Sequence, residues 1–575
     1  MWWPNLLLLL WSAASSVNAS PALQRREDSP TDVCKRWSHQ TALVNGTIYI
    51  YGGQATTTAG QTSDTWNNNF LTLTVQADWN IDSPALKGLP LPSGPPKVAN
   101  GYLWHDYSRI FLYGGLYSDK PVAQPDPFAL WQYDITAGSW EVVKTAGGDG
   151  VQRAAEGAGV SVPGRSLGFY FGGHLDGYTT QGWSQSIARV YLKSLLEFDM
   201  GEMRFNNITA SGLEKAGVPQ RADGVLLFVP WGDEGILLAI GGGTNETFSQ
   251  MNVIDVYDLG TKKWTKQSTD GSPPKYRVNP CAVVASAPDG SSHNIYFFGG
   301  QNLVPFADQL QYDDMYILTV PAFKWISVDM KDQSIPPARA GHTCDIVGRQ
   351  MIVIGGYTST ELSCDSPGIY VFDASTLQWT TGYSAAAGGF GSGSSKNDQP
   401  YKVPQAVVDV IGGNQNGGAT VTKPVKTADS DSPLATGDSG DYKYTTYIPR
   451  PTIVVSTAPD GTVSTSTVTP SPYSGGRGPN VGAIVGGVVG GIIFLVLLIL
   501  GGAFWLYKRK IRELRASAAM LGGYTDKAEL PAAEDRGRNT ATSPGSSLDL
   551  NEMQGEPTFW GVLLSPRRSL RVVNH

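Results

Sequence analysis

The chain has 575 residues, of which 41% are hydrophobic, 10% aromatic and only 16% charged, and its formal net charge is −7. An excess of acidic over basic side chains gives no reason to expect nucleic-acid binding. The 68 glycines and 37 prolines are typical of a turn-rich, all-β protein rather than a helical one. Six histidines and four cysteines are too few for an obvious metal cluster, so we expect neither a metal nor another cofactor.

Residues 1–19 are predicted to form a secretory signal peptide. An apolar run from Leu6 to Trp11 is followed by a small-residue cleavage site that ends at Ala19. The alternatives are a buried strand or a short anchor. Residues 20–33 are polar and are expected to form an N-terminal linker.

A short apolar strand that ends in a double glycine is repeated through the middle of the chain. The clearest copy is the run from Asn294 to Gly300, Asn-Ile-Tyr-Phe-Phe-Gly-Gly. Such side chains suit a pleated, buried surface, and the glycines allow a positive φ or close backbone packing where the strand leaves the sheet. In chain order the copies end at Gly52-Gly53, Gly114-Gly115, Gly172-Gly173, Gly241-Gly242, Gly299-Gly300 and Gly355-Gly356. Their spacing of about 60 residues is typical of one supersecondary unit per repeat.

Each double glycine is followed by a variable polar loop, an alternating strand and an aromatic residue. The fourth copy, for example, continues from Ile254 through Tyr257 to Trp264. The aromatic residues that close the repeats are Trp79, Trp140, Phe205, Trp264, Trp325 and Trp379. Another short strand, often led by a basic residue, precedes each double-glycine strand, so each repeat contains about four short strands.

This pattern resembles the kelch repeat. The resemblance implies an all-β, kelch-type β-propeller over residues 34–413, in which each repeat forms one four-stranded antiparallel blade and the closing aromatic residues fill the space between blades. Six blades are predicted. A seventh is the alternative, because Val407 to Gly413 is another β-like run that ends in a double glycine. Since no Tyr or Trp follows it, we interpret this run as a closing or flanking strand.

A different organisation is predicted after the propeller. Residues 414–479 are rich in Gly, Ser, Thr and Pro, a composition that buries too little apolar area to form a core, and are expected to form an extended, O-glycosylated stalk. No charged residue lies between Arg477 and Lys508. Residues 483–507 are therefore predicted to cross about 30 Å of hydrocarbon as one transmembrane helix.

The flanks of this helix predict its orientation. Basic residues crowd its C-terminal side from Lys508 to Arg515, so the positive-inside rule places residues 508–575, a predicted disordered tail, in the cytosol. We expect a single-pass type I protein of the cell membrane with an extracellular propeller. Glycines at four-residue spacing from Gly482 to Gly490 would permit a helix-mediated homodimer, although glycine is common in membrane helices.

All four cysteines lie in the predicted ectodomain, where an oxidising route favours two disulfides. Three connectivities are open. Cys344 and Cys364 flank the double glycine of one repeat, so we expect them to pair with each other and to leave Cys34 with Cys281.

Three N-glycosylation sequons are present in the predicted propeller. They begin at Asn45, Asn207 and Asn245. Asn45 also precedes a glycine, and the alternative interpretation of that sequon is a tight Asn-Gly hairpin turn before Thr47.

No catalytic constellation is recognised in the sequence. It contains no Gly-x-Ser-x-Gly nucleophile elbow, phosphate-binding loop or metal-binding helix motif. An oxidase resembling galactose oxidase would need a copper site of His and Tyr ligands with a Tyr–Cys crosslink. The ectodomain histidines form no close pair in the sequence, and the cysteines are expected to form disulfides. We therefore expect a protein that is not an enzyme.

The candidate binding residues are basic or imidazole side chains that open the first strands of the repeats. They are Arg36, His39, Arg165, Arg221, Arg277, Arg339 and His342. If these strands line the axis, their ends ring one mouth of the channel and could bind an anionic or carbohydrate ligand. In the alternative, each arginine braces its neighbouring blade through carbonyl and carboxylate contacts. The loop insertions after the double glycines, above all 174–195, are a further candidate surface.

These features predict a recognition module at the cell surface or cell wall, with a protein or carbohydrate ligand on the propeller loops. The layout resembles fungal kelch-repeat surface proteins. Two alternatives stay open: a membrane-tethered carbohydrate-active or oxidase-like propeller enzyme, and a surface sensor that signals through its tail.

Overall fold

The computed structural model describes residues 27–209, 213–302, 309–359, 362–389, 400–428, 431–437, 452–457 and 463–468. The predicted signal peptide (1–19), transmembrane helix (483–507) and tail (508–575) lie outside these residues. Among the described helices, none is long and apolar enough to cross a membrane.

Six antiparallel sheets, each built on a four-stranded meander in chain order, form the framework of the described residues. We call them blades 1 to 6. Blade 1 contains β2 (Gln40–Val44), β3 (Thr47–Tyr51), β6 (Phe70–Thr74) and β8 (Leu86–Gly88). Blade 2 contains β9 (Ala99–His105), β10 (Arg109–Leu116), β11 (Leu130–Asp134) and β12 (Ser139–Val143). Blade 3 contains β13 (Ala158–Val162), β14 (Leu167–Phe171), β17 (Leu195–Asp199) and β18 (Arg204–Asn207).

Blades 4 to 6 repeat this arrangement, and blade 5 gains a short parallel edge strand. Blade 4 contains β19 (Val225–Val229), β20 (Ile236–Ile240), β21 (Val253–Asp258) and β22 (Lys263–Ser268). Blade 5 contains β24 (Cys281–Ser286), β25 (His293–Phe298), β26 (Met315–Val320) and β27 (Lys324–Ser327), with β23 (Asp270–Gly271) beside β27. Blade 6 contains β28 (Thr343–Val347), β29 (Gln350–Ile354), β30 (Ile369–Asp373) and β31 (Gln378–Thr380). The predicted four-stranded antiparallel blades are confirmed, and the described residues are mostly β rather than all-β.

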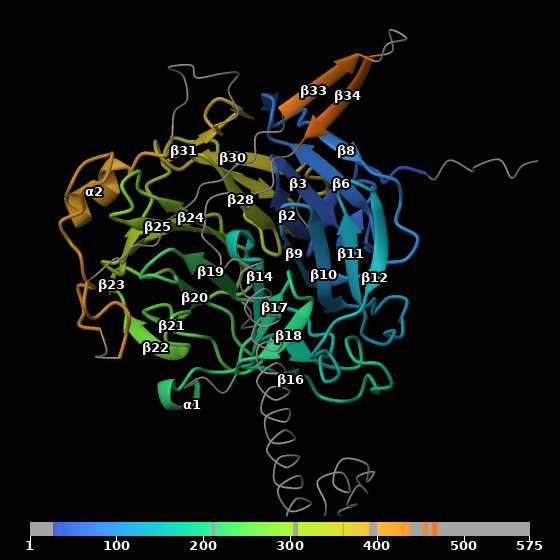
Figure 1. Ribbon diagram of the computed structural model, residues 1–575, viewed down its shortest axis with the longest axis horizontal. Helices are drawn as coiled ribbons and strands as arrows, with labels where there is room; N and C mark the ends of the chain where they lie inside the picture. The colour runs from blue at the N-terminus through green and yellow to red at the C-terminus, as the bar shows by residue number, and fades with distance from the viewer. Residues whose placement is uncertain are drawn as a thin grey trace, which may run out of the picture. The chain divides into compact units, whose positions relative to one another are not determined.

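The first strand of each blade lies at the centre of the arrangement. Each first strand contacts the first strand of the next blade, and β28 of blade 6 returns to β2 of blade 1. The blades therefore close into a ring, which is seen face-on in Figure 1.

The double glycines join neighbouring blades. The second glycine of each pair donates its backbone N–H to a carbonyl oxygen at the start of the next blade, at 2.7–3.1 Å. The pairs are Gly53–Val98, Gly115–Ala154, Gly173–Arg221, Gly242–Arg277, Gly300–Arg339 and Gly356–Arg36. Both glycines of every pair have a positive φ, which other L-residues rarely adopt. The last pair joins blade 6 to blade 1.

The closing aromatic residues pack between blades, as predicted. Trp140 of blade 2 lies 5.2 Å from Phe70 of blade 1, measured between ring centroids, and Trp264 of blade 4 lies 5.0 Å from Phe171 of blade 3. Trp79 differs from the prediction: it forms β7 (Trp79–Asn80), which pairs with β32 (Gly382–Tyr383), and it stacks on Tyr383 beyond blade 6. Trp79 therefore helps to close the ring, and β8 supplies the outer strand of blade 1.

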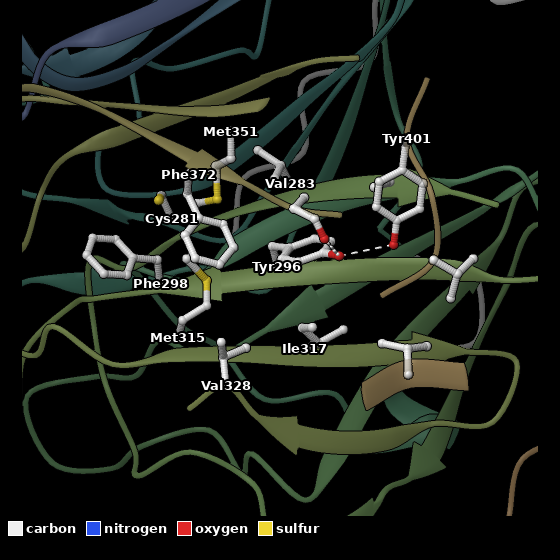
Figure 2. Packing of buried hydrophobic residues seen from close by; sticks show 14 of the residues in the cluster. Cys281, Val283, Tyr296, Phe298, Met315, Ile317, Val328, Met351, Phe372 and Tyr401 are labelled. Atoms are coloured by element: carbon white, nitrogen blue, oxygen red, sulfur yellow. Dashed lines mark hydrogen bonds between the residues drawn. The ribbon is translucent and has the colours of Figure 1, made fainter. Parts of the chain in front are cut away.

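Two predictions about the region after blade 6 are wrong. The run that we interpreted as a flanking strand is a helix, α2 (Gln405–Ile411), because Val407 and Ile411 lie one helical turn apart and both are buried. This helix and Tyr401 cover the aromatic and methionine cluster shown in Figure 2, where the Tyr401 and Tyr296 hydroxyls are 3.0 Å apart.

The first part of the predicted stalk also packs on the propeller. The side chain of Leu434 is fully buried, and Trp231 Nε1 donates to the Pro433 carbonyl at 3.3 Å. The Val425 N–H donates to the Ala322 carbonyl at 3.0 Å. Residues 414–428 and 431–437 therefore form a strap along blades 4 and 5 rather than an extended linker. Farther along, β33 (Thr452–Thr457) and β34 (Val463–Val468) pair as an antiparallel hairpin.

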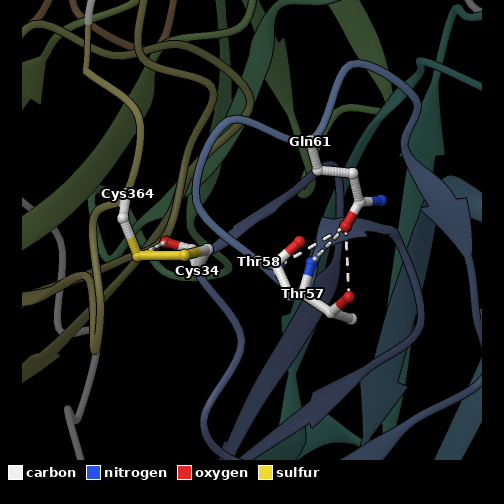
Figure 3. The surroundings of a disulfide bond; sticks show 5 residues. All are labelled: Cys34, Thr57, Thr58, Gln61 and Cys364. Atoms are coloured by element: carbon white, nitrogen blue, oxygen red, sulfur yellow. Dashed lines mark hydrogen bonds between the residues drawn. A yellow bond between two sulfur atoms is a disulfide. The ribbon is translucent and has the colours of Figure 1, made fainter.

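The predicted disulfide pairing is wrong. Cys34 is bonded to Cys364, with Cα atoms 4.7 Å apart (Figure 3), and Cys281 is bonded to Cys344, with Cα atoms 5.6 Å apart. Closure of the ring brings the segment before blade 1 against the loop of blade 6, where the Asp365 N–H donates to the Cys34 carbonyl. Cys281 and Cys344 lie on neighbouring first strands. Each disulfide therefore links two parts of the ring rather than two positions of one blade.

The remaining elements are short and lie on the loops. They are β1 (Lys35–Trp37), β4 (Gln54–Thr56) and β5 (Thr65–Trp66), which pair as a small sheet; β15 (His174–Leu175) with β16 (Val190–Tyr191); the 3-10 turn Pro163–Arg165; and α1 (Leu213–Ala216).

Candidate functional site

A closed ring of backbone hydrogen bonds surrounds the axis where the first strands begin. One residue per blade donates its N–H to the carbonyl oxygen of its counterpart in the preceding blade, at 2.5–3.0 Å. We call these six residues the axial ring: Ser38, Asn100, Glu156, Asp223, Asn279 and Gly341. All have φ between 53° and 65°, a left-handed conformation that favours glycine, Asn and Asp.

Three of the predicted binding arginines lie directly before this ring and are buried. Arg221, Arg277 and Arg339 form ion pairs with Asp255, Asp314 and Asp365, which precede or lie on the third strands of the same blades. Each also donates to the carbonyl of the first glycine of its own blade, for example Arg339 Nη1 to Gly355 O at 2.7 Å. These are the carbonyl and carboxylate contacts of the bracing alternative rather than ligand contacts, but they brace the arginine's own blade and not the neighbouring blade.

The other predicted basic and imidazole residues are not gathered at the mouth. Arg36 is buried, and burial lowers its pKa to about 10. Burial also lowers the pKa of His39 and of His342 to about 3, so both imidazoles are neutral at physiological pH. Arg165 lies in the turn between the first two strands of blade 3, where it pairs with Glu234, so its assignment to a strand start is wrong.

One group of side chains has the spacing of a metal site. Ligand atoms of Cys281, His342 and Cys344 lie within 4.8 Å of one another. The two sulfur atoms are bonded to each other as a disulfide, however, so they are not available as thiolate ligands.

A pocket of ≈ 400 Å³ opens on one side of the axial ring. Ring residues of blades 3 to 5 form its inner side, and the loops that follow the double glycines of these blades form its outer side. It is lined by Glu156, Arg189, Tyr191, Asp223, Gly243, Thr244, Asn245, Asn279 and Gln301. Apart from Gly243 and the Tyr191 ring, the lining presents carboxyl, amide, hydroxyl and guanidinium groups.

A network of paired charges holds the blade 3 side of this pocket. The buried His174 ring has Nδ1 3.0 Å from Glu156 Oε2 and Nε2 3.1 Å from Asp176 Oδ2. Arg189 contacts the same two carboxylates at 2.9 and 3.2 Å. Burial alone would lower the pKa of His174, but the two carboxylates outweigh it and raise that pKa to about 9. Two cations therefore face two carboxylates.

Asp223 has a different environment from these paired carboxylates. Burial and the neighbouring Glu156 carboxylate raise the pKa of Asp223 well above its usual value. Burial would do the same to Glu156, but His174 and Arg189 hold the pKa of Glu156 below its usual value. The surroundings of Asp223 therefore favour its protonated form, which can donate a hydrogen bond, whereas His174 and Arg189 favour the carboxylate form of Glu156.

The sequence predicted part of this site. The insertion 174–195 does reach the mouth, through Arg189 and Tyr191. The ring residues Glu156, Asp223 and Asn279 were missed. A signal was present, since a short polar residue or glycine follows two positions after Arg36, Arg221, Arg277 and Arg339.

The three sequons occupy different surroundings. Asn207 is exposed on blade 3, and Asn245 is exposed at the rim of the pocket. Asn45 is half-buried in a two-residue Asn-Gly turn between β2 and β3, as the alternative interpretation predicted, and its Nδ2 donates to the Tyr107 carbonyl at 2.6 Å.

Four-stranded kelch blades around a polar axial pocket define the class of this molecule. A family model described as the KLHDC2/KLHL20/DRC7 Kelch-repeats domain matches residues 227–389. The chain is 44% identical over 649 aligned residues to a Kelch repeat-containing protein of Arthroderma benhamiae, and the match covers 96% of this chain and 94% of that protein. The chain belongs to the kelch-repeat proteins.

Similarity to other named proteins is partial. The Rab9 effector protein with kelch motifs of Mus musculus is 30% identical over 157 residues, which is 27% of this chain and 38% of that protein. The Acyl-CoA-binding domain-containing protein 5 of Arabidopsis thaliana is 27% identical over 152 residues, 26% of this chain and 21% of that protein.

Proposed function

We propose that the protein is a single-pass type I membrane protein whose extracellular kelch propeller is a recognition module of the cell surface or cell wall. The two disulfides support an extracellular propeller, since disulfides persist in oxidising compartments. The charge-free stretch 483–507, with basic residues after it, supports a membrane anchor and a cytosolic tail.

The ligand site in this proposal is the axial pocket. The observation that carries it is convergence: three blades and three loops direct polar side chains into one hollow. A concave site with a few convergent polar groups is the usual form of a small-ligand site. Anion binding by a ring of arginines is not part of the proposal, because Arg221, Arg277 and Arg339 are buried in ion pairs.

The charges of the pocket favour a neutral ligand that is rich in hydroxyl groups. His174 and Arg189 are balanced by Glu156 and Asp176, so a charged ligand would have to compete with existing pairs. The lining offers the ligand amide and hydroxyl groups together with the Asp223 carboxyl group. Thr244 Oγ1 also accepts from the Glu246 and Thr247 N–H groups, and Gln301 Oε1 accepts from Gln311 Nε2. Carbohydrate is the ligand class that this lining fits best.

The proposal is tested by binding of purified full-length protein to an array of neutral and acidic saccharides. Asp223→Gly removes the carboxyl group without backbone strain, because glycine tolerates φ 60° and Gly341 occupies the same ring position in blade 6. Ser38→Gly is the matched control, since Ser38 belongs to the ring but does not line the pocket. We expect Asp223→Gly alone to weaken binding of a neutral saccharide about tenfold. Absence of saccharide binding, or equal binding by both variants, would contradict the proposal.

A second candidate function is hydrolysis of a saccharide. Two carboxyl groups whose surroundings shift their pKa values in opposite directions, as at Asp223 and Glu156, are typical of an acid and a base in catalysis. Glu156 is, however, already engaged by His174 and Arg189, which leaves it less able to activate water. Reducing-end release from any bound saccharide, abolished by Asp223→Asn, would favour the enzyme over the recognition module.

A further inference from the structure

A second hollow lies beside the axial pocket and has a different chemical character. Its volume is ≈ 490 Å³, and it is lined by Phe248, Met251, Asn252, Pro273, Pro274, Lys275, Tyr276, Asn302 and Tyr312. The Phe248 and Tyr276 rings are nearly parallel, with 10° between their planes and 6.1 Å between their centroids. Tyr276 is 48% exposed, so this aromatic pair is open to solvent. We call this hollow the aromatic groove.

The aromatic groove and the axial pocket share their walls. The loop after the double glycine of blade 4 contributes residues 243–245 to the pocket and Phe248, Met251 and Asn252 to the groove. The segment before blade 5 contributes Asn279 to the pocket and Tyr276 to the groove. Gln301 lines the pocket, and the next residue, Asn302, lines the groove. The two hollows are therefore adjacent, and these shared segments form the partition between them.

Together the two hollows present complementary chemistry to one elongated molecule. The axial pocket offers polar groups to hydroxyls. The groove offers an exposed tyrosine whose ring is nearly parallel to that of Phe248, with the Tyr276 hydroxyl 3.2 Å from Gln250 Oε1. A sugar ring has both features, hydroxyl groups at its edge and an apolar C–H face that an aromatic ring can cover. Amides of Asn252 and Asn302 flank the aromatic surface.

We propose that the ligand is a linear oligosaccharide, one end of which enters the axial pocket while the rest crosses the partition and stacks on Tyr276. This inference rests on the proposed function, because it assigns the axial pocket to the terminal sugar. It adds a second subsite and a required ligand length. A single sugar fills one hollow, whereas a longer chain gains the contact at Tyr276.

The test is the dependence of affinity on chain length. Full-length protein is titrated with β-linked glucose and N-acetylglucosamine oligomers of two and of six units. We expect the six-unit oligomer of at least one series to bind about tenfold more tightly than the two-unit oligomer, since an exposed aromatic anchor is a common source of binding energy. Tyr276→Ala should remove this length advantage and leave two-unit binding unchanged. Val142→Ala, at an exposed apolar residue on the outer strand of blade 2, is the control and should change neither value.

The outcomes separate this inference from the proposed function. Equal affinity for both lengths, with binding still lost in Asp223→Gly, contradicts the proposed subsite in the aromatic groove and leaves the axial pocket as the ligand site. A length advantage that depends on Tyr276 but not on Asp223 overturns the axial site and keeps the groove as the ligand surface. If no oligomer binds at either length, both are overturned.

Discussion

The two halves of the axial ring are built in different ways. Where blades 5, 6 and 1 meet, the contacts are covalent and buried: both disulfides are there, as are the neutral His39 and His342, and the ring residues are Gly341 and Ser38. We call this part the closure seam. In the pocket sector, which faces the axis from blades 3 to 5, ion pairs hold Glu156, and backbone hydrogen bonds of the axial ring hold Asp223 and Asn279. Blade 5 belongs to both parts, since Cys281 lies on its first strand.

This difference indicates that the closure seam contributes mainly to the stability of the fold, whereas the pocket sector provides the groups that can bind a ligand. A ring must be closed somewhere, and closure orders two chain segments that are 330 residues apart at Cys34 and Cys364. Covalent links at the seam supply that closure. The opposite side can then carry partly desolvated charges and left-handed polar residues, which cost stability but give a binding surface.

The largest expected effect comes from opening the seam. Replacing both Cys34 and Cys364 by serine removes a crosslink across most of the propeller, and the chain-entropy argument predicts a loss of about 3–5 kcal/mol in the free energy of unfolding. Denaturant titration of wild type and variant measures this loss. Saccharide binding at temperatures where the variant is folded should be retained, because the pocket sector does not depend on this bond. Loss of saccharide binding by a folded variant would show that the pocket sector depends on the disulfide at the closure seam.

A second effect compares equivalent glycines in the two halves. A Cβ on Gly355, at the seam, would overlap the backbone carbonyl of Arg36, whereas a Cβ on Gly241, in the pocket sector, meets nothing closer than 3.5 Å. Both have a left-handed φ, so both alanine variants carry about 1 kcal/mol of backbone strain. Gly355→Ala should cost about 2–3 kcal/mol more than Gly241→Ala in unfolding free energy. Equal losses would mean that the Arg36 backbone moves aside to accommodate the added methyl group.

These glycines also show how far sequence reasoning reaches. The double glycine, the aromatic closure and the four strands of each blade are local patterns, so they could be predicted. The disulfide partners and the axial ring depend on which blades adjoin after closure, which no local pattern contains. The run from Val407 to Ile411 was mistaken for a strand because a short apolar run fits a helical turn as well as a strand. Arg165 was misplaced because a basic residue in a turn looks like one at a strand start.

The two halves should respond to pH in opposite directions. In the pocket sector, the pKa of His174 is raised to about 9, so its ion pairs stabilise the fold fully below pH 6.5 and lose this contribution as pH rises through 9. At the seam, the pKa of His342 is lowered to about 3, so the unfolded chain binds the proton first and stability falls as pH drops below 6.5. At its limit the effect amounts to about 3 kcal/mol for His174 and about 5 kcal/mol for His342, since each pH unit between the unfolded and folded pKa is worth about 1.4 kcal/mol.

Denaturation of His174→Gln and His342→Gln at pH 5, 7.5 and 9.5 separates these contributions. The first variant should lose most stability relative to wild type at pH 5 and least at pH 9.5. The second should be closest to wild type at pH 5, where the buried neutral imidazole is most costly. Parallel pH profiles for both variants would contradict the assignment of opposite roles to the two histidines.

The smallest effect concerns the role of Asp223 itself. If its carboxyl group donates a hydrogen bond to a saccharide, Asp223→Asn keeps a donor of the same shape and should bind within about twofold of wild type, whereas Asp223→Gly should bind about tenfold more weakly. If a carboxylate is needed instead, both variants should lose binding equally. The measurement is calorimetric titration with the tightest array saccharide at pH 5 and 7.5, with Ser38→Gly as the seam control. If Ser38→Gly weakened binding as much as Asp223→Gly does, the ligand would span the whole axial ring. The closure seam and the pocket sector would then differ in their contributions to stability but not in ligand binding.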